Sequence, residues 1–170
     1  MNAKKTGATP PTNDDGDAFR LENFLPYRLS VTSNHVSRMF ARHYSEQFGL
    51  TIPEWRVLAV VGRFGSLSPS KVGELSAMDK VKVSRAAATL VNRGLLRQTQ
   101  DPHDGRGRLL RLTRKGTAIY ADVVPLARDL ESSLASGLTR TEWSGLNRIL
   151  LKLNNHVLAI EEPDGGSFVD

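Results

Sequence analysis

The sequence predicts a mainly α-helical fold that carries one small β-hairpin. Apolar residues recur at helical spacing through most of residues 23–161, whereas residues 95–113 contain two strand-like runs around a glycine-rich turn. The chain of 170 residues is long enough for one domain with its own core. We expect this domain at residues 23–162, between a disordered tail at 1–22, rich in Pro, Gly, Asn and Asp, and a flexible tail at 163–170.

Capping residues predict where the helices begin and end. A first helix at residues 23–47 is stopped by Gly49, and Thr51 and Glu54 have capping-box spacing for a second helix at 52–64. Ser68 before Pro69 begins a short helix that ends near residue 77. Asp79 then caps a helix at 80–93, which Gly94 ends. The two short helices and their tight turn are a helix-turn-helix candidate.

The helix at residues 80–93 divides into two faces. Val83, Ala87, Leu90 and Val91 share a core-facing side, and the opposite side is polar and basic, with Lys82, Arg85, Thr89 and Arg93. Ala86 and Ala88 keep the helix slim enough for a DNA major groove, which is about 12 Å wide. Residues 79–119 carry ten Lys and Arg against three Asp and Glu, so the basic charge is concentrated here. An ordinary solvated face is the alternative interpretation.

The segment after this helix predicts a β-hairpin with a cationic tip. Residues 95–100 and 108–113 form the strands, and the helix-turn-helix together with the hairpin makes a winged helix at about residues 51–113. Gly105 and Gly107 let the tip turn tightly, Arg106 projects toward a minor groove, and Asp104 is placed to orient its guanidinium. A flexible loop with an incidental arginine is the alternative.

The sequence resembles the MarR family of winged-helix transcriptional regulators over roughly residues 24–160. The resemblance rests on the wing pattern Asp104, Arg106, Leu112 and Thr113, followed by Lys115-Gly116, and on three further stretches: TIPEWRVLAVV at 51–61, Val83-Ser84-Arg85, and Arg93-Gly94-Leu95. Many members have Asp-Arg-Arg where this chain has Asp104-Gly105-Arg106, so one wing cation is missing.

The resemblance implies an obligate homodimer whose dimerisation helices are residues 23–47 and 114–161. The pattern of residues 139–160 supports dimerisation independently of the resemblance. Thr139 and Glu142 have the spacing of a capping box, and the apolar residues that follow recur at alternating spacings of three and four, which forms a seam for packing against another helix. Thr113 is expected to cap the helix after the hairpin, and Pro125 to bend it or begin a new segment. The alternative is a monomer that buries this apolar seam by folding the helix back onto itself. The expected dimerisation residues are Leu29, Val36, Phe40, Trp143, Leu146, Leu150, Leu153 and Val157, with Ile160 continuing the seam.

Two-fold symmetry predicts that two recognition helices read the halves of a palindromic operator in double-stranded DNA, with the wings in the flanking minor grooves. Phosphate contacts set affinity, and base contacts set sequence preference. The candidate DNA-binding residues are Lys80, Lys82, Ser84, Arg85, Thr89, Asp104, Arg106, Arg108 and Arg111.

Members of the family commonly respond to small aromatic acids that bind between the dimerisation layer and the winged helix. An arginine or histidine is suited to a carboxylate or phosphate, and Trp55 to an aromatic ring. An aromatic carboxylate and an aryl-CoA thioester both fit as effector. The expected function is a repressor of an aromatic-catabolic operon. The candidate ligand residues are Arg28, His35, Arg38, Arg42, His43, Trp55 and Arg56, each of which also has an ordinary structural or surface interpretation.

Other classes of function are weakly supported. The chain has no cysteine, its four histidines form no pair one helical turn apart, and it has no phosphate-binding glycine loop or nucleophile elbow, so we expect no metal, no cofactor and no enzyme. It has no apolar run of membrane-spanning length, and a cytoplasmic protein is expected. An architectural DNA-binding protein without an effector is the main alternative function.

Overall fold

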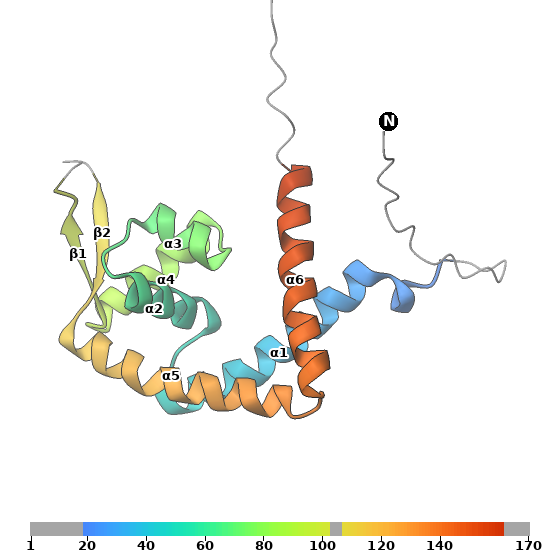
Figure 1. Cartoon of the computed structure of the whole chain (residues 1–170). Coiled ribbons are helices and arrows are strands. Elements are labelled where there is room, and N and C mark those ends of the chain that lie inside the picture. Colours follow the sequence, from blue (N-terminus) through green and yellow to red (C-terminus); the bar gives the residue numbers. More distant parts are fainter. Residues whose placement is uncertain (1–18, 103–106, 162–170) are drawn as a thin grey trace, which may run out of the picture. The chain divides into compact units, whose positions relative to one another are not determined.

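The computed structural model describes residues 19–102 and 107–161. In these ranges the chain forms the 3₁₀ turn η1 (Leu21–Asn23), six helices and one hairpin (Figure 1). The helices are α1 (Leu25–Phe48), α2 (Ile52–Phe64), α3 (Pro69–Ser76), α4 (Lys80–Asn92), α5 (Arg114–Ala135) and α6 (Arg140–Glu161). The strands are β1 (Leu96–Gln100) and β2 (Arg108–Leu112). The expected mainly α-helical fold with one hairpin is confirmed.

The chain divides into two compact units, residues 1–39 and residues 40–170. In the first unit the structure describes η1 and the beginning of α1, where the apolar side chains of Phe19, Phe24 and Leu25 are exposed. The second unit contains the end of α1 and all later elements. The two expected tails fall mainly on residues 1–18 and 162–170, which lie outside the described residues.

The predicted caps form in the second unit. The Thr51 hydroxyl accepts from the Glu54 amide, and the Glu54 carboxylate accepts from the Thr51 amide at 2.9 Å, which completes the capping box of α2. Ser68 and Asp79 accept from the amides three residues later and cap α3 and α4. Thr113 does the same for α5. Because local chemistry fixes these ends, the sequence places them within a few residues.

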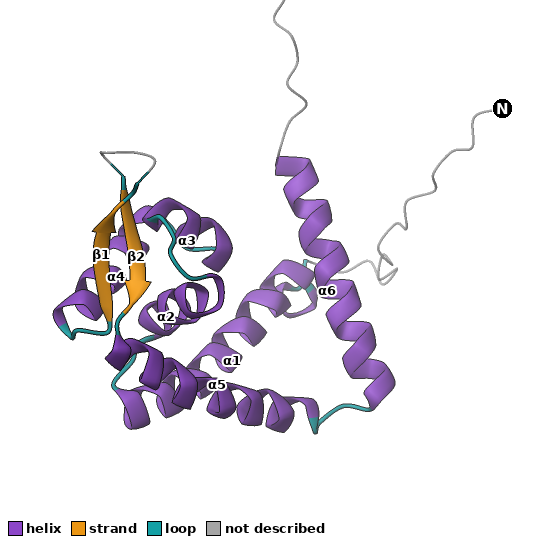
Figure 2. Ribbon diagram, turned by 60° about the vertical axis from the view of Figure 1, so that its left-hand side comes forward, coloured by secondary structure: helices purple, strands orange, loops and turns teal. Residues whose placement is uncertain are grey.

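The core of the second unit lies among α2, α3, α4 and the hairpin, and the end of α1 and α5 add Tyr44 and Val123 to it (Figure 2). Strands β1 and β2 pair antiparallel, with Leu96 opposite Leu112. Leu67, between α2 and α3, adds a third short pairing, since its amide and carbonyl bond to the carbonyl and amide of Leu110 at 3.2 and 2.7 Å. The hairpin is therefore tied to the α2–α3 connection as well as to α4.

Helix α5 is continuous through Pro125, so the expectation that Pro125 begins a new segment is wrong. Helix α5 is tied to the core at its start, where Gly116 is buried, and again at Val123. A side chain at position 116 would place its Cβ 1.9 Å from the Leu95 carbonyl oxygen. This close approach explains the glycine of the Lys115-Gly116 motif.

Helix α6 begins with the predicted capping box of Thr139 and Glu142. Its described side chains include no buried residue, and Leu146, Leu150 and Val157 are exposed, while Trp143 and Leu153 are half-buried. The apolar side of this amphipathic helix is therefore left largely uncovered by the residues that the structure describes.

Candidate nucleic-acid interface

Helix α4 buries one face and exposes the other. Val83, Ala86, Ala87 and Leu90 are buried in the core, and the side chain of Val91 is half-buried. Ala86 is thus a core residue as well as a small one. The predicted DNA-binding residues of this helix are all exposed: Lys80, Lys82, Ser84, Arg85 and Thr89. The core contact fixes the rotation of α4, so these side chains are presented together.

Two of these side chains have partners within the helix. The Lys82 ammonium lies 2.9 Å from the carboxylate of Asp79, whose other oxygen accepts from the Lys82 amide at 2.8 Å. These bonds to Lys82 lower the pKa of Asp79. The Thr89 hydroxyl donates to the Arg85 carbonyl at 3.1 Å. DNA that engages Lys82 has to compete with Asp79 for the ammonium.

The prediction that Arg93 belongs to the outward basic face is wrong. Its guanidinium donates to the carbonyls of Phe48 at 2.7 Å and Gly49 at 2.8 Å, and lies 3.8 Å from the Glu54 carboxylate. Arg93 therefore holds the end of α1 and the start of α2 against the end of α4. These partners lie about 45 residues earlier in the chain, so helical periodicity alone could not reveal them.

The hairpin adds cations on both of its faces. Arg108 and Arg111 are exposed on β2, but their spacing of three residues places them on opposite sides of the strand. Arg111 donates from Nε to the Ser66 hydroxyl at 2.7 Å. Arg111 pairs in register with Arg97 of β1, an exposed cation that the sequence did not predict as a DNA-binding residue. The strand register, which places Arg97 opposite Arg111, identifies Arg97 as a further candidate DNA-binding residue.

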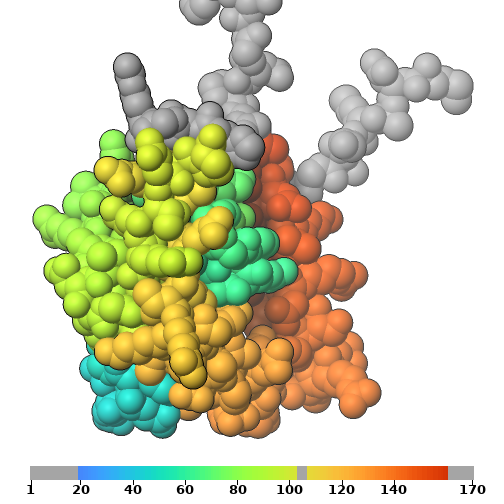
Figure 3. All heavy atoms as spheres, turned by 90° about the vertical axis from the view of Figure 1, so that its left-hand side faces the viewer, coloured from blue at the N-terminus to red at the C-terminus, as the bar shows by residue number. Residues whose placement is uncertain are grey.

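Asp104 and Arg106, the predicted wing-tip residues, lie outside the described residues. On the loop side of the strands, the Asp101 amide donates to the Gly107 carbonyl at 3.0 Å. Figure 3 shows α4 and the hairpin exposed over one continuous face of the molecule. The exposed cations described on α4 and the hairpin are Lys80, Lys82, Arg85, Arg97, Arg108 and Arg111, with Arg108 and Arg111 on opposite sides of β2.

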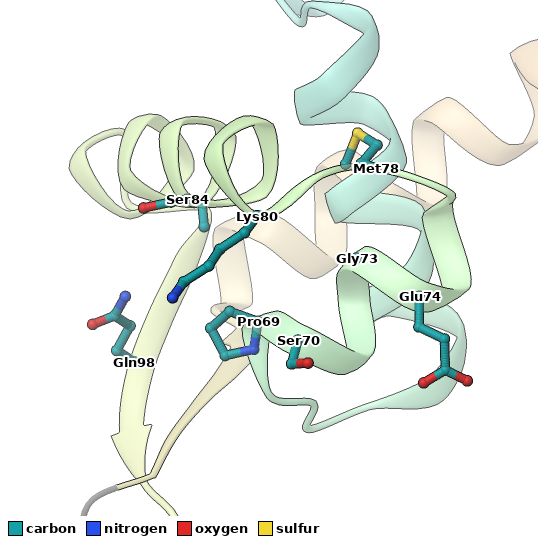
Figure 4. A pocket seen from close by; sticks show the side chains of 9 residues that line it. Pro69, Ser70, Gly73, Glu74, Met78, Lys80, Ser84 and Gln98 are labelled. Carbon is teal, nitrogen blue, oxygen red and sulfur yellow. The ribbon is translucent and has the colours of Figure 1, made fainter. Parts of the chain in front are cut away.

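A pocket of about 770 Å³ opens between α3, α4 and β1. Its lining includes Pro69 and Glu74 of α3, Lys80 and Ser84 of α4, and Gln98 of β1 (Figure 4). The Lys80 side chain extends into the space between Pro69 and Gln98. Two predicted DNA-binding residues therefore line a cavity of the size that small ligands occupy.

The predicted ligand residues differ in their surroundings. Trp55 is half-buried, and its ring lies 4.8 Å from that of Tyr44, whose buried hydroxyl has no hydrogen-bond partner among the described residues. His43 is half-buried. The others have exposed side chains, three in the first unit and two in the second: Arg28, His35, Arg38, Arg42 and Arg56.

The described parts of the chain show neither a metal-binding cluster nor a membrane-spanning helix. They contain no group of three or more His, Asp or Glu side chains arranged to hold a metal ion. They also contain no helix that is both long enough and apolar enough to span a lipid bilayer.

Comparison with known proteins decides the family. A model of the MarR family matches residues 48–107, from the end of α1 to the hairpin. The structure of a MarR family transcriptional regulator from Silicibacter pomeroyi is 33% identical in sequence, with a TM-score of 0.67, and the match covers 81% of this chain and 98% of that one. The chain belongs to the MarR family.

Two other relatives of this MarR family regulator extend the comparison. The HTH-type transcriptional repressor IacR of Pseudomonas putida is 26% identical over 156 residues, or 88% of this chain and 93% of IacR. The structure of Bordetella bronchiseptica BpsR, described as regulated in DNA binding by 6-hydroxynicotinic acid, is 25% identical with a TM-score of 0.75 and covers 81% of this chain and 98% of BpsR. The chain is thus a transcriptional regulator of the winged-helix type, not an enzyme.

Proposed function

We propose that this regulator is a homodimeric repressor that acts in the cytoplasm on a palindromic operator. The observation that carries the proposal is the exposed basic side of α4, whose opposite side is fixed in the core. A helix presented in this way fits the major groove, and the hairpin beside it reaches the flanking minor groove. The likeness to IacR, a repressor, supports negative control.

The proposal gives different tasks to different residues. Lys82, Ser84 and Arg85 contact bases or phosphates, and Thr89 lies on the same exposed side. Lys80, Arg108 and Arg111 contact phosphates, and Arg97 joins them because it lies beside Arg111. Arg106 enters the minor groove, with Asp104 orienting it. Phosphate contacts release counterions, so they make affinity depend on salt concentration.

The salt dependence of operator binding tests this assignment. Replacing Arg108 or Arg97 with alanine should weaken binding to all sequences and reduce the slope of log affinity against log salt by about 1. Lys152→Ala, which removes an exposed cation from α6, is the matched control and should leave the slope unchanged. Equal slopes for all three variants and the unmodified protein would remove the hairpin from the interface.

The effector that we propose is an aromatic carboxylate or its CoA thioester, which releases the repressor from an aromatic-catabolic operon. The likeness to BpsR supports an aromatic effector, because 6-hydroxynicotinic acid is an aromatic acid. The same likeness favours the free acid over the thioester. A carboxylate pairs with arginine or histidine, and an aromatic ring stacks on Trp55. An effector shifts DNA binding only if it binds one arrangement of the dimer more tightly than the other.

Release of labelled operator DNA by benzoic, hydroxycinnamic and 6-hydroxynicotinic acids and by their CoA thioesters tests the effector class. Arg42→Ala and Arg56→Ala should keep operator affinity and lose the response. A response that survives both changes, but is lost when Gln98 is replaced, would move the effector to the α3–α4–β1 pocket. Binding that random DNA competes away equally, with no response to any compound, would favour an architectural DNA-binding protein.

A further inference from the structure

Val81, the second residue of α4, is an exposed apolar side chain on the basic side of the helix. It is 57% exposed, whereas Leu90 is 0% exposed. Successive helical residues are about 100° apart, so two residues that are nine positions apart lie on opposite sides. Val81 therefore points directly away from the core that Leu90 anchors.

The surroundings of Val81 are polar and cationic. Lys80 and Lys82 flank it in sequence, and Arg85 and Ala88 follow on the same side, four and seven residues later. A single exposed apolar residue is ordinary on a protein surface. Val81 differs because it lies in the first turn of the helix, the part whose side chains contact base edges in helix-turn-helix proteins.

We propose that Val81 contacts the methyl group of a thymine in each half of the operator, and so specifies that base. A valine side chain has no hydrogen-bond donor or acceptor, and thymine is the base that presents a methyl group in the major groove. The branched side chain keeps one strongly preferred rotamer in a helix, so its methyl groups are held in place with little loss of freedom on binding. This inference rests on the proposed entry of α4 into the major groove.

Deoxyuridine lacks the thymine methyl group and otherwise presents the same groove edge, so it isolates the contact. An operator is first selected in vitro from a random duplex pool with the full-length protein, and each thymine is then replaced by deoxyuridine in turn. Replacement at one position of each half-site should weaken binding by the unmodified protein about fourfold per half-site, the loss expected for one buried methyl group. Replacement at the other thymines should have little effect.

The variant Val81→Ala completes the test as a double-mutant cycle. The variant should bind the thymine operator about as weakly as the unmodified protein binds the deoxyuridine operator. It should bind the thymine and deoxyuridine operators with equal affinity. Because Val81 is exposed and alanine favours helix more than valine does, the unfolding midpoint of the variant should be equal to or slightly above that of the unmodified protein. Arg85→Ala is the control, expected to weaken binding to both operators while the deoxyuridine effect remains.

Three results would overturn the inference. The first is a selected operator in which no thymine is required. The second is unchanged binding of the unmodified protein when deoxyuridine replaces any thymine. The third is a Val81→Ala variant that retains the full deoxyuridine effect. Each of these leaves sequence-specific DNA binding intact. Failure of the unmodified protein to select any sequence from the pool instead overturns the proposed function, and the thymine contact with it, so the two failures are distinguishable.

Discussion

The guanidinium of Arg93 donates to the carbonyl oxygen of Phe48 at 2.7 Å, so the last residue of α1 is bonded to the residue that follows α4. Lys115, in the first turn of α5, donates from Nζ to the Arg93 carbonyl at 3.1 Å. The Thr113 hydroxyl donates to the Gly94 carbonyl at 2.6 Å. The two motifs Arg93-Gly94-Leu95 and Thr113 to Gly116 are therefore bonded to each other, and they hold α4 to the end of α1 and the start of α5.

Arg93→Ala should lower the free energy of unfolding by about 2 kcal/mol, because two backbone carbonyls lose a charged donor. Arg93→Lys should recover part of this loss, since an ammonium lacks the planar fork that reaches both carbonyls. Urea unfolding measures the change. Arg97→Ala, at an exposed strand position, is the control and should change stability by less than about 0.5 kcal/mol. Equal effects at positions 93 and 97 would contradict a structural role for Arg93.

Gly116→Ala should destabilise the fold strongly, by about 3 kcal/mol, because the added Cβ would lie 1.9 Å from the Leu95 carbonyl oxygen and the backbone has to shift. Gly145→Ala is the matched change in α6, where an added Cβ meets no atom within 4 Å. It should be neutral or raise stability by up to about 1 kcal/mol. Thermal unfolding of the pair checks the prediction, and a Gly116→Ala variant as stable as the unmodified protein would disprove the close approach.

Asp79 should make stability depend on pH in the acidic range. Its folded pKa lies below the ordinary value because the carboxylate accepts bonds from Lys82. The stabilisation is therefore present above the pKa of the unfolded state and is lost as the pH falls through the folded pKa. Unfolding of Asp79→Asn and of the unmodified protein, followed from neutral to acidic pH, should differ most at neutral pH and converge on acidification. A difference that stays constant with pH would contradict the assignment.

Tyr44→Phe should stabilise the protein by about 1 kcal/mol, because the buried hydroxyl bonds to no group in the part of the chain that the structure describes, and its removal relieves a desolvation cost. Burial raises the pKa of Tyr44 to about 12 from 10.0. The unfolded state thus loses the phenol proton first, and the gain from Tyr44→Phe should grow as the pH rises above about 10. Chemical unfolding at neutral and alkaline pH measures both effects, and a destabilised variant would show that the hydroxyl has a partner.

Leu150→Glu combined with Leu153→Glu should convert the dimer to a monomer that no longer binds a palindromic operator, because two charges per chain would enter an apolar seam. Asn155→Glu, on the opposite side of α6, is the control and should leave the dimer intact. Sedimentation velocity distinguishes these outcomes. A double variant that still sediments as a dimer would show that the seam lies elsewhere.

The sequence predicted the helix ends well because the groups that set them are local. Thr51, Ser68, Asp79, Thr113 and Thr139 each bond to an amide three residues later, so the pattern and the contact lie in the same short segment. The exposed basic side of α4 was also predictable, because helical periodicity and the buried row fix which residues face outward.

Contacts between distant segments were not predictable in the same way. Periodicity placed Arg93 with Lys82 and Arg85, but its partners at residues 48, 49 and 54 are brought near only by packing. The pairing of Leu67 with Leu110 and the proximity of Arg97 to Arg111 likewise depend on how the hairpin docks and on its register. Val81 was not predicted as a DNA-binding residue, because charge and polarity mark the candidates in the sequence and its side chain is apolar.

Fluorescence anisotropy of the full-length protein on labelled DNA from upstream of its own gene tests the central claim, that the exposed face of α4 reads a specific operator. The unmodified protein should bind, unlabelled operator should displace the label at far lower concentration than random duplex, and Lys82→Ala with Arg85→Ala should strongly reduce that preference without unfolding the protein. If random DNA displaces the label as well as the operator does, or the double variant retains full discrimination, α4 does not read the sequence and the account is wrong.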